Sequence, residues 1–490
     1  MVDYTAIYPM VVLAIFALLV PAVRIIGKSD KATAAFTLIG IAASLYFVLS
    51  FLWNGTAAAS YADLVRLDAF SALFMLVFLA VAAYVVIASI KFVDQEKHTG
   101  EYYSLILLAT TGMLVVASSL DLITVFVGIE LTSLASYALV AFRKKDKKGA
   151  EAATKYFIIG GLSSAIALFG ISLLYGVTGT TNFFAMQAAI GLLGGSMEPM
   201  LLLAIVMIVA GFGFKVAIVP FHMWAPDVYE GAPTTITAML AAGSKKMGFV
   251  ALFKVFIIAL FAIRADWQVM IGILAILTMT VGNLIAVQQT NIKRMLAYSS
   301  IAQAGYILIV LPIAVVGSGT VSTYGLEGGI FHIVTHAFMK GGAFIIVAAL
   351  SVAALGETLA DYKGLAKRAP LMAFAMAIML FSLAGIPPLA GFASKFVLFS
   401  GAIDASQLAG NQWMVWLAIA GILNSALSLY YYARLVKYMY VDKGPETRIK
   451  VPISMAVAVA ICFLAVVIIG LYPEPVIQAC ANAASAFFHP

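Results

Sequence analysis

One glutamate and six lysines lie within or beside long apolar segments of this 490-residue chain. The glutamate is Glu130, near the middle of residues 121–142, which read DLITVFVGIELTSLASYALVAF. A charge at membrane depth is costly, so such a side chain normally faces a bundle interior or a wet cavity and marks a pathway for ions or protons. One acid and several bases in successive segments therefore indicate a membrane protein that moves protons. The lysines are Lys215, Lys245, Lys246, Lys254, Lys340 and Lys395.

Glu130 and Lys215 are the first candidate pair. A buried acid and a buried base that lie close together each favour the charged form of the other, and separation removes this effect. A Glu–Lys pair that can separate therefore changes its affinity for protons, as a pump requires. Lys155, in EAATKYF at the start of the next apolar segment, could bias this pair, or it could be an interfacial lysine whose head group reaches water.

Histidines accompany the lysines farther along the chain. His332, His336 and Lys340 follow one another at a spacing of four in HIVTHAFMK, which places them on one helical stripe. Histidine titrates near neutral pH and can carry protons between lysines. A haem site is disfavoured, because one helix face cannot supply ligands on both sides of an iron. His222, in VPFHMWAP, is either a relay or a packing residue at a helix end, and we favour the relay.

Lys245 and Lys246 are neighbours about one third of the way into their apolar segment. Adjacent residues of a helix point about 100° apart. We therefore expect only one of the two lysines to face the bundle interior, with Lys245 as the candidate.

The composition is that of a membrane protein. Hydrophobic residues make up 63% of the chain and charged residues 10%, against roughly 25% charged in an ordinary soluble domain. About 14 stretches are long enough to cross a bilayer, which takes ~20 residues. The sequence predicts an all-α polytopic membrane protein with short loops and no soluble domain. The stretches are 5–26, 33–52, 68–90, 102–119, 121–142, 153–177, 200–222, 233–262, 269–289, 294–316, 326–354, 370–400, 412–440 and 451–476.

The seventh and twelfth stretches are interrupted by glycine and proline. The seventh reads GFGFKVAIVPF around Lys215, and the twelfth reads LAGIPPLAGFASKF and ends near Lys395. Proline removes a helical hydrogen bond, and backbone opened in this way is tolerated in a membrane only where protein or water satisfies it. Broken segments at corresponding positions indicate an internal repeat around a transport site. The alternative is two ordinary proline kinks.

A repeat of five stretches fits this spacing, with stretches 4–8 and 9–13 as the two copies. Because five is odd, the copies must have opposite orientations in the membrane. The prediction divides the chain into N-terminal helices (1–100), a first half-channel repeat (101–263), a second half-channel repeat (264–440) and a C-terminal helix (441–490).

The basic residues predict the orientation. Connections after odd-numbered stretches hold 16 Lys and Arg, whereas those after even-numbered stretches hold only Arg66 and Arg264. This asymmetry predicts a multi-pass protein of the cell membrane with the odd connections in the cytoplasm and both termini on the extracytoplasmic side. The net charge of +7 is thus a topology signal and not a sign of nucleic-acid binding.

No cofactor site is predicted for this chain. It has two cysteines, too few for a four-thiolate cluster, and neither a GxGxxG nor a GxxxxGK[ST] motif. Redox chemistry that powers proton movement would have to occur in another polypeptide.

Several long motifs carry a family resemblance. FHMWAPDVYEGAPT, AAGSKKMGF, NIKRMLAYSSIAQAGY, HIVTHAFMKGGAF and LAGIPPLAGFASKF resemble the antiporter-like membrane subunits of respiratory complex I over roughly residues 100–440, and PDVYEGAPT resembles the N-type subunit. The resemblance implies 14 helices, with inverted five-helix repeats and broken helices 7 and 12. It implies that Glu130 and Lys215 form the first half-channel pair, that Lys245 connects the halves and that Lys395 is the exit lysine. It also implies roles for Lys155 and His222, but none for Lys254.

The resemblance further implies a function. The implied function is proton translocation by a membrane subunit of a complex I-type dehydrogenase. The electron donor of such a complex would be NADH or a reduced deazaflavin coenzyme, and the electron acceptor a quinone or methanophenazine. Partners would be further membrane-arm subunits and a peripheral arm that carries flavin and iron–sulfur clusters. The alternatives are a subunit of a multisubunit Na⁺/H⁺ antiporter, which the N-type wording of PDVYEGAPT argues against, and a stand-alone transporter or structural subunit.

Overall fold

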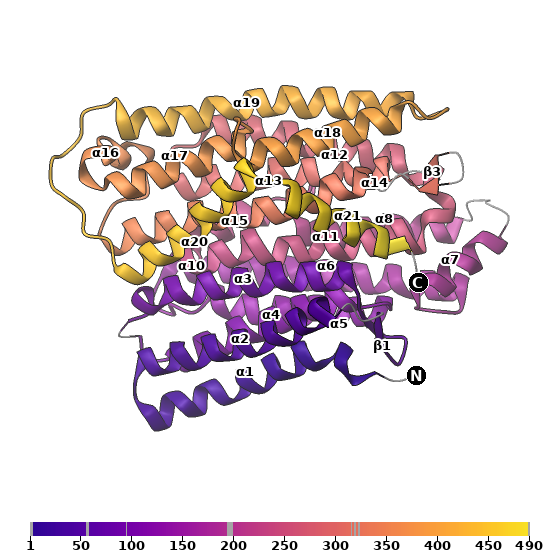
Figure 1. Cartoon of the computed structure of the whole chain (residues 1–490), viewed down its shortest axis with the longest axis horizontal. Coiled ribbons are helices and arrows are strands. Elements are labelled where there is room, and N and C mark those ends of the chain that lie inside the picture. Colours follow the sequence, from indigo (N-terminus) through magenta and orange to yellow (C-terminus); the bar gives the residue numbers. More distant parts are fainter. Residues whose placement is uncertain are drawn as a thin grey trace.

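The computed structural model describes residues 3–54, 58–94, 96–193, 199–314, 316–317, 320–321 and 324–488. Its long helices run side by side along one direction, as Figure 1 shows. Within the described residues, twelve helices are long and apolar enough to cross a membrane. The prediction of an all-α polytopic membrane protein is confirmed. The twelve contain α1 (Tyr8–Gly27), α2 (Asp30–Asn54), α3 (Ala69–Phe92), α4 (Thr99–Ser118), α5 (Leu122–Val140), α6 (Lys147–Thr178), α8 (Pro199–Val216), α12 (Arg264–Gln288), α13 (Ile292–Leu308), α15 (Tyr324–Val352), α19 (Val415–Tyr440) and α20 (Ile453–Leu471).

The two remaining expected stretches are divided into shorter pieces. Residues 233–262 form α10 (Thr234–Met239) and α11 (Lys245–Phe253), with π-helical turns at Leu240–Ser244 and Lys254–Ala259. Residues 370–400 lie in α17 (Pro370–Ala384) and α18 (Ala390–Ser406), which are separated at Gly385. The count of 14 crossings and the inverted repeat remain predictions.

Shorter elements connect the long helices. They are α7 (Phe183–Leu192), α9 (Trp224–Gly231), α14 (Val310–Ile313), α16 (Leu365–Arg368) and α21 (Glu474–Phe488), together with two antiparallel hairpins, β1 (Ala59–Tyr61) with β2 (Val65–Leu67) and β3 (Val316–Gly317) with β4 (Thr320–Val321). The segment 441–490, expected to hold one helix, thus holds two. Helix α20 ends at Leu471 just before Pro473, whose backbone has no N–H group to continue a helix.

Polar caps fix where the long helices start. The Asp121 side chain accepts hydrogen bonds from the backbone N–H groups of Ile123 and Thr124, each over 2.9 Å, and so begins α5 directly after α4. This confirms that the fourth and fifth stretches are separate helices joined by a very short turn. The Asn291 side chain begins α13 in the same way.

The centre of the bundle is formed by α11, α13 and α15. The apolar windows of α13 and α15 are each 94% buried, whereas those of α1 and α2 are 22% and 28% buried. Every residue of α11 is buried. The lysines on these central helices are therefore held inside protein, and α1 and α2 form an outer edge of the bundle (Figure 1).

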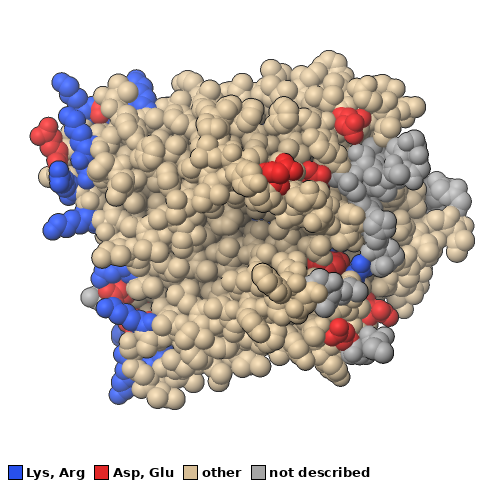
Figure 2. Space-filling model, in the orientation of Figure 1, with Lys and Arg blue, Asp and Glu red and all other residues tan. Residues whose placement is uncertain are grey.

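Basic residues gather at one end of the bundle. Figure 1 marks both chain termini at one end of the bundle, and in Figure 2 most of the visible Lys and Arg lie at the opposite end. This arrangement agrees with basic connections that share one side of the membrane. The assignment of that side to the cytoplasm remains a prediction.

Candidate functional site

Glu130 and Lys215 line one small cavity between α5, α6 and α8. Its volume is about 10 Å³, close to the space of a single water. Helices α6 and α8 approach closely because Gly211 of α8 has no side chain. A Cβ added at Gly211 would lie only 2.5 Å from the Cβ of Ala167 on α6. The structure thus brings the predicted pair to one site.

The acid and the base each form a hydrogen bond with a different serine. The Ser164 hydroxyl donates to the Glu130 carboxylate over 2.5 Å, and the Lys215 ammonium donates to Ser133 over 2.8 Å. Among the described residues, Glu130 and Lys215 make no direct ion pair. Ser133 lies three residues after Glu130 on α5, on the same helix face. A hydroxyl both donates and accepts, so these serines suit a proton path between the two charges.

The first break places Lys215 at the end of a helix. Helix α8 stops at Val216, and Ala217 has a left-handed backbone with φ of 55°. Lys215 packs against α11, where a Cβ at Gly248 would lie 3.2 Å from the lysine Cγ. The pair on α5 and α8 therefore adjoins the helix that carries the next lysines.

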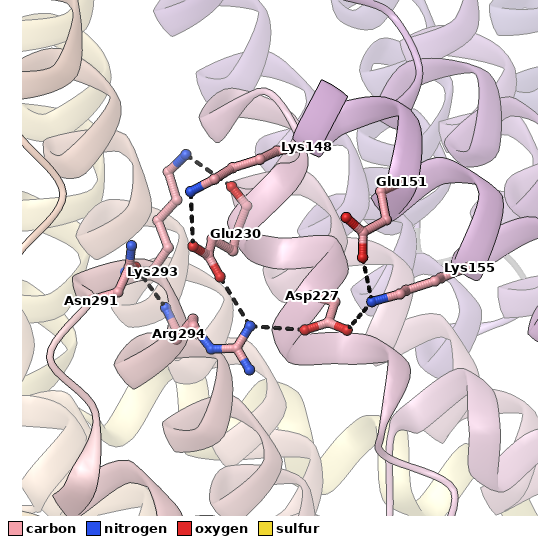
Figure 3. A network of polar contacts seen from close by, with 8 residues as sticks. All are labelled: Lys148, Glu151, Lys155, Asp227, Glu230, Asn291, Lys293 and Arg294. Atoms are coloured by element: carbon pink, nitrogen blue, oxygen red, sulfur yellow. Dashed lines mark hydrogen bonds and ion pairs between the residues drawn. The ribbon is translucent and has the colours of Figure 1, made fainter. Parts of the chain in front are cut away.

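Lys155 lies in a separate cluster at the basic end, shown in Figure 3. Its ammonium is 2.8 Å from Asp227 on α9 and 2.7 Å from Glu151 on α6. Arg294 of α13 approaches the other oxygen of Asp227 at 2.8 Å and Glu230 at 2.9 Å. Burial raises the pKa of Asp227, but hydrogen bonds from Lys155 and Arg294 outweigh it and hold the pKa below its ordinary value. Lys155 thus contacts Asp227 and Glu151 and not Glu130, and its role remains a prediction.

His222 lies in the connection between α8 and α9 and is buried. Its Nδ1 atom has no hydrogen-bond partner within the described part of the chain. The structure therefore leaves both interpretations of His222, relay and packing, as predictions.

Both lysines of the neighbouring pair are buried, so the expectation that only one faces the interior is wrong. The reason is that α11 is covered by protein on all sides. The two differ in their partners. Lys245 donates to the hydroxyl and carbonyl oxygens of Ser300 over 3.2 and 3.4 Å, whereas the Lys246 ammonium has no hydrogen-bond partner among the described residues.

Adjacent serines of α13 join Lys245 to Lys340. Ser300 accepts from Lys245, and Ser299 accepts from the ammonium of Lys340 on α15 over 2.6 Å. The Ser299 hydroxyl also bonds the phenol of Tyr432 on α19. The lysines of two central helices therefore meet at one turn of α13.

The two histidines continue this row along α15. His332 bonds Ser394 of α18 at 2.9 Å through Nδ1 and Gln303 of α13 at 3.0 Å through Nε2. His336 is fully buried, with its ring centroid 6.0 Å from that of His332, and neither ring nitrogen has a partner among the described residues. The predicted stripe of His332, His336 and Lys340 thus lies entirely inside the bundle.

Lys395 closes the second break. Its ammonium donates to the carbonyl oxygens of Leu383 and Ala384, the last residues of α17, over 2.9 and 3.3 Å, and to Ser425 over 3.1 Å. Gly385 ends α17 in a left-handed conformation with φ of 93°. Carbonyl groups at the C-terminal end of a helix lack hydrogen-bond partners within the helix. An ammonium placed there supplies the missing hydrogen bonds and is attracted by the negative end of the helix dipole. Lys395 follows its break, whereas Lys215 precedes its own.

Lys254, to which the sequence assigned no role, makes a similar contact. Its ammonium donates to the carbonyl oxygens of Ala117 and Ser119, at the end of α4, over 2.6 and 2.7 Å. The contact joins the end of α11 to α4 near the β1–β2 hairpin, since Val65 pairs with Ser119.

Sequence reasoning missed the polar side chains that connect the lysines. These are Ser133, Ser164, Ser299, Ser300, Gln303, Ser394 and Ser425, together with Asp227 and Arg294 of the basic end. The run YSSIAQAGY, polar at several positions within an apolar segment, carries the only visible signal for Ser299, Ser300 and Gln303.

Comparison with known proteins identifies the family of this chain. Residues 119–427 match the family described as NADH:quinone oxidoreductase/Mrp antiporter, transmembrane. The chain belongs to this family. The matched range contains the lysine and histidine row from Glu130 to Lys395.

Two curated members of the family are similar over most of their length. The chain is 50% identical over 435 residues to the F(420)H(2) dehydrogenase subunit N of Methanosarcina mazei, covering 86% of this chain and 85% of that protein. It is 42% identical over 487 residues to the NADH-quinone oxidoreductase subunit N of Trichlorobacter lovleyi, covering 97% and 96%.

Three solved structures share the fold of this chain. A chain of respiratory complex I from Thermus thermophilus matches with a TM-score of 0.80 and 29% identity, over 97% of this chain and 99% of that one. A chain of an archaeal membrane-bound sulfane sulfur reductase matches with a TM-score of 0.86 and 28% identity, over 99% and 98%. A chain of the Mrp complex from Dietzia, at 22% identity and a TM-score of 0.87 over 98% and 97%, shares the fold.

Proposed function

We propose that this chain is a proton-translocating, N-type membrane subunit of a complex I-type dehydrogenase. The observation that carries the proposal is a row of buried bases through the centre of the bundle, each with a hydrogen bond to a serine or a glutamine. They are Lys215, Lys245, Lys340, His332 and Lys395. Buried bases that are satisfied by neutral hydroxyls and carbonyls can lose and regain protons without breaking an ion pair.

In this proposal, protons enter near Glu130 and pass along the row toward Lys395. Glu130 and Lys215 form the first half-channel pair, Lys245 joins the halves, and Lys340, His336 and His332 carry protons to Lys395. Lys155 and His222 act at the basic end and at the first break. The chain itself catalyses no redox step.

Electron transfer would occur in partner subunits that carry flavin and iron–sulfur clusters. The donor is NADH or a reduced deazaflavin coenzyme, and the acceptor a quinone or methanophenazine. The similarity to the F(420)H(2) dehydrogenase subunit N of Methanosarcina mazei supports a deazaflavin donor, and the relative from Trichlorobacter lovleyi supports NADH and a quinone. The partners would be other membrane-arm subunits and a peripheral arm, as in respiratory complex I.

The test is proton uptake by sealed vesicles that contain the whole complex. Addition of the electron donor should acidify the vesicle interior when the complex is inverted, and Lys215→Ala should abolish most of this acidification at equal complex content. A subunit of a Na⁺/H⁺ antiporter would instead dissipate an imposed pH gradient on addition of Na⁺ without any electron donor. Such donor-independent, Na⁺-dependent exchange would overturn the proposal.

A further inference from the structure

Asp227 is shared by two cations from different parts of the chain. Its Oδ2 atom lies 2.8 Å from the ammonium of Lys155 on α6, and its Oδ1 atom lies 2.8 Å from Nη1 of Arg294 on α13. Figure 3 shows the carboxylate between the two. Because α6 and α9 belong to residues 101–263 and α13 to residues 264–440, this one carboxylate joins the two predicted half-channels.

The cluster around Asp227 has a balanced set of charges and room for water. A cavity of about 170 Å³ is lined by Lys148, Lys155 and Arg294 and by Glu151, Asp227 and Glu230. Asp227 is one-third exposed, and Arg294 is 30% exposed. A polar cavity of this size holds several waters, so the ion pairs there are hydrated and can exchange partners.

The same helix leads from this cluster to the Glu130–Lys215 cavity. Lys155 and Ser163 lie eight residues apart on one face of α6, a distance of about 12 Å along the helix axis. Ser163 lines the cavity of Glu130 and Lys215, and its neighbour Ser164 binds Glu130. Of the charged residues of α6, Lys155 is therefore the nearest along the helix to the cavity of Glu130 and Lys215.

We propose that Asp227 is a positioning residue that couples the two half-channels. While Arg294 occupies one oxygen of Asp227, the carboxylate is shared and Lys155 is held between Asp227 and Glu151. When α13 moves Arg294 away, Asp227 binds Lys155 alone, so an event in the second half-channel changes the charge at the mouth of the first. The inference rests on the proposed proton-pumping function.

The chain offers a matched control on the same helix. Lys293 precedes Arg294 on α13 and pairs with Glu357 at 2.5 Å. Glu357 is 33% exposed, as is Asp227, but its ion pair with Lys293 lies within the second predicted half-channel. Glu357→Gln therefore removes a similar ion pair without breaking the link between the half-channels.

The test measures protons pumped per electron in vesicles that contain the whole complex, at equal complex content and equal electron flux. We expect Arg294→Gln and Asp227→Asn each to lower this ratio at least about twofold. The double variant should fall no further than the lower single variant, because both changes break the Asp227–Arg294 ion pair on which the coupling depends. Arg294→Lys should restore most of the ratio, since a single nitrogen of Arg294 makes both ion pairs, and Glu357→Gln should leave it unchanged.

The outcomes separate this inference from the proposed function. If Arg294→Gln pumps normally while Lys215→Ala does not, the coupling role fails and the pumping function stands. If Lys215→Ala also pumps normally, the proposed function fails as well. If Arg294→Gln lowers complex content, or if Glu357→Gln lowers the ratio equally, the cluster only stabilises the fold and the inference is overturned.

Discussion

The ammonium of Lys395 donates to the carbonyl oxygen of Leu383 over 2.9 Å, across the break between α17 and α18. The break frees carbonyls at the end of α17, and the lysine side chain returns to satisfy them. The interruption of the twelfth stretch thus exposes neutral carbonyl acceptors to Lys395. Neutral acceptors do not hold the lysine proton permanently, as a carboxylate would.

Lys395→Met should lower pumping without destabilising the assembled complex, because the side chain is buried in protein and not in lipid. Lys395→Arg should be equally deficient, since a guanidinium keeps its proton at any working pH. The number of protons pumped per electron in vesicles distinguishes a lysine that gives up and regains its proton from one that only supplies a fixed charge. Full pumping by the arginine variant would show that Lys395 is only a fixed charge.

Ser164→Ala should impair pumping nearly as much as a change at Glu130 itself. Loss of a hydrogen bond to a charged group costs about 1.5–3 kcal/mol, and here it leaves the carboxylate with one partner fewer. The control is Ser172→Ala on the same helix, because the Ser172 hydroxyl donates only to the carbonyl oxygen of Phe169. Equal pumping by the two variants would remove Ser164 from the path.

Lys246→Met should stabilise the protein, in contrast to Lys245→Met. The Lys246 ammonium is buried without a hydrogen-bond partner among the described residues, and an unsatisfied buried group costs about 1–3 kcal/mol. Lys245→Met instead leaves Ser300 without its donor. Thermal denaturation of the detergent-solubilised complex compares the two. A lower Tm for Lys246→Met would mean that this ammonium has partners in the assembled protein.

A cysteine introduced at Lys145 should react with an impermeant thiol reagent only from the cytoplasmic side of sealed vesicles. Lys145 is exposed in the basic connection between α5 and α6. As the opposite control, a cysteine at exposed Asp63, in the turn of the β1–β2 hairpin, should react only from the extracytoplasmic side. The native Cys462 and Cys480 are buried and should not react. Labelling of Lys145→Cys from outside would invert the predicted topology.

The membrane helices and the titratable row could be predicted because lysine and histidine stand out in apolar sequence. The cost of burying a charge makes each one conspicuous, so the stripe of His332, His336 and Lys340 and the breaks near Lys215 and Lys395 were recognisable. Serine is common in membrane helices, so Ser133 and Ser299 carried no comparable signal.

Contacts between distant segments were beyond sequence reasoning. The ion pairs of Asp227 with Lys155 and Arg294 depend on how three helices meet at the basic end. The burial of both Lys245 and Lys246 depends on α11 being surrounded by other helices, which periodicity within one helix does not reveal. The Lys254 contact with the end of α4 depends on tertiary packing in the same way.

The ratio of protons pumped per electron in Glu130→Gln and Lys215→Ala tests the account most directly. Both side chains line the cavity between α5, α6 and α8, and both act in the first half-channel of the proposal. At normal complex content, each variant should transfer electrons while pumping far fewer protons than the unaltered complex. Normal pumping in both variants would contradict the account.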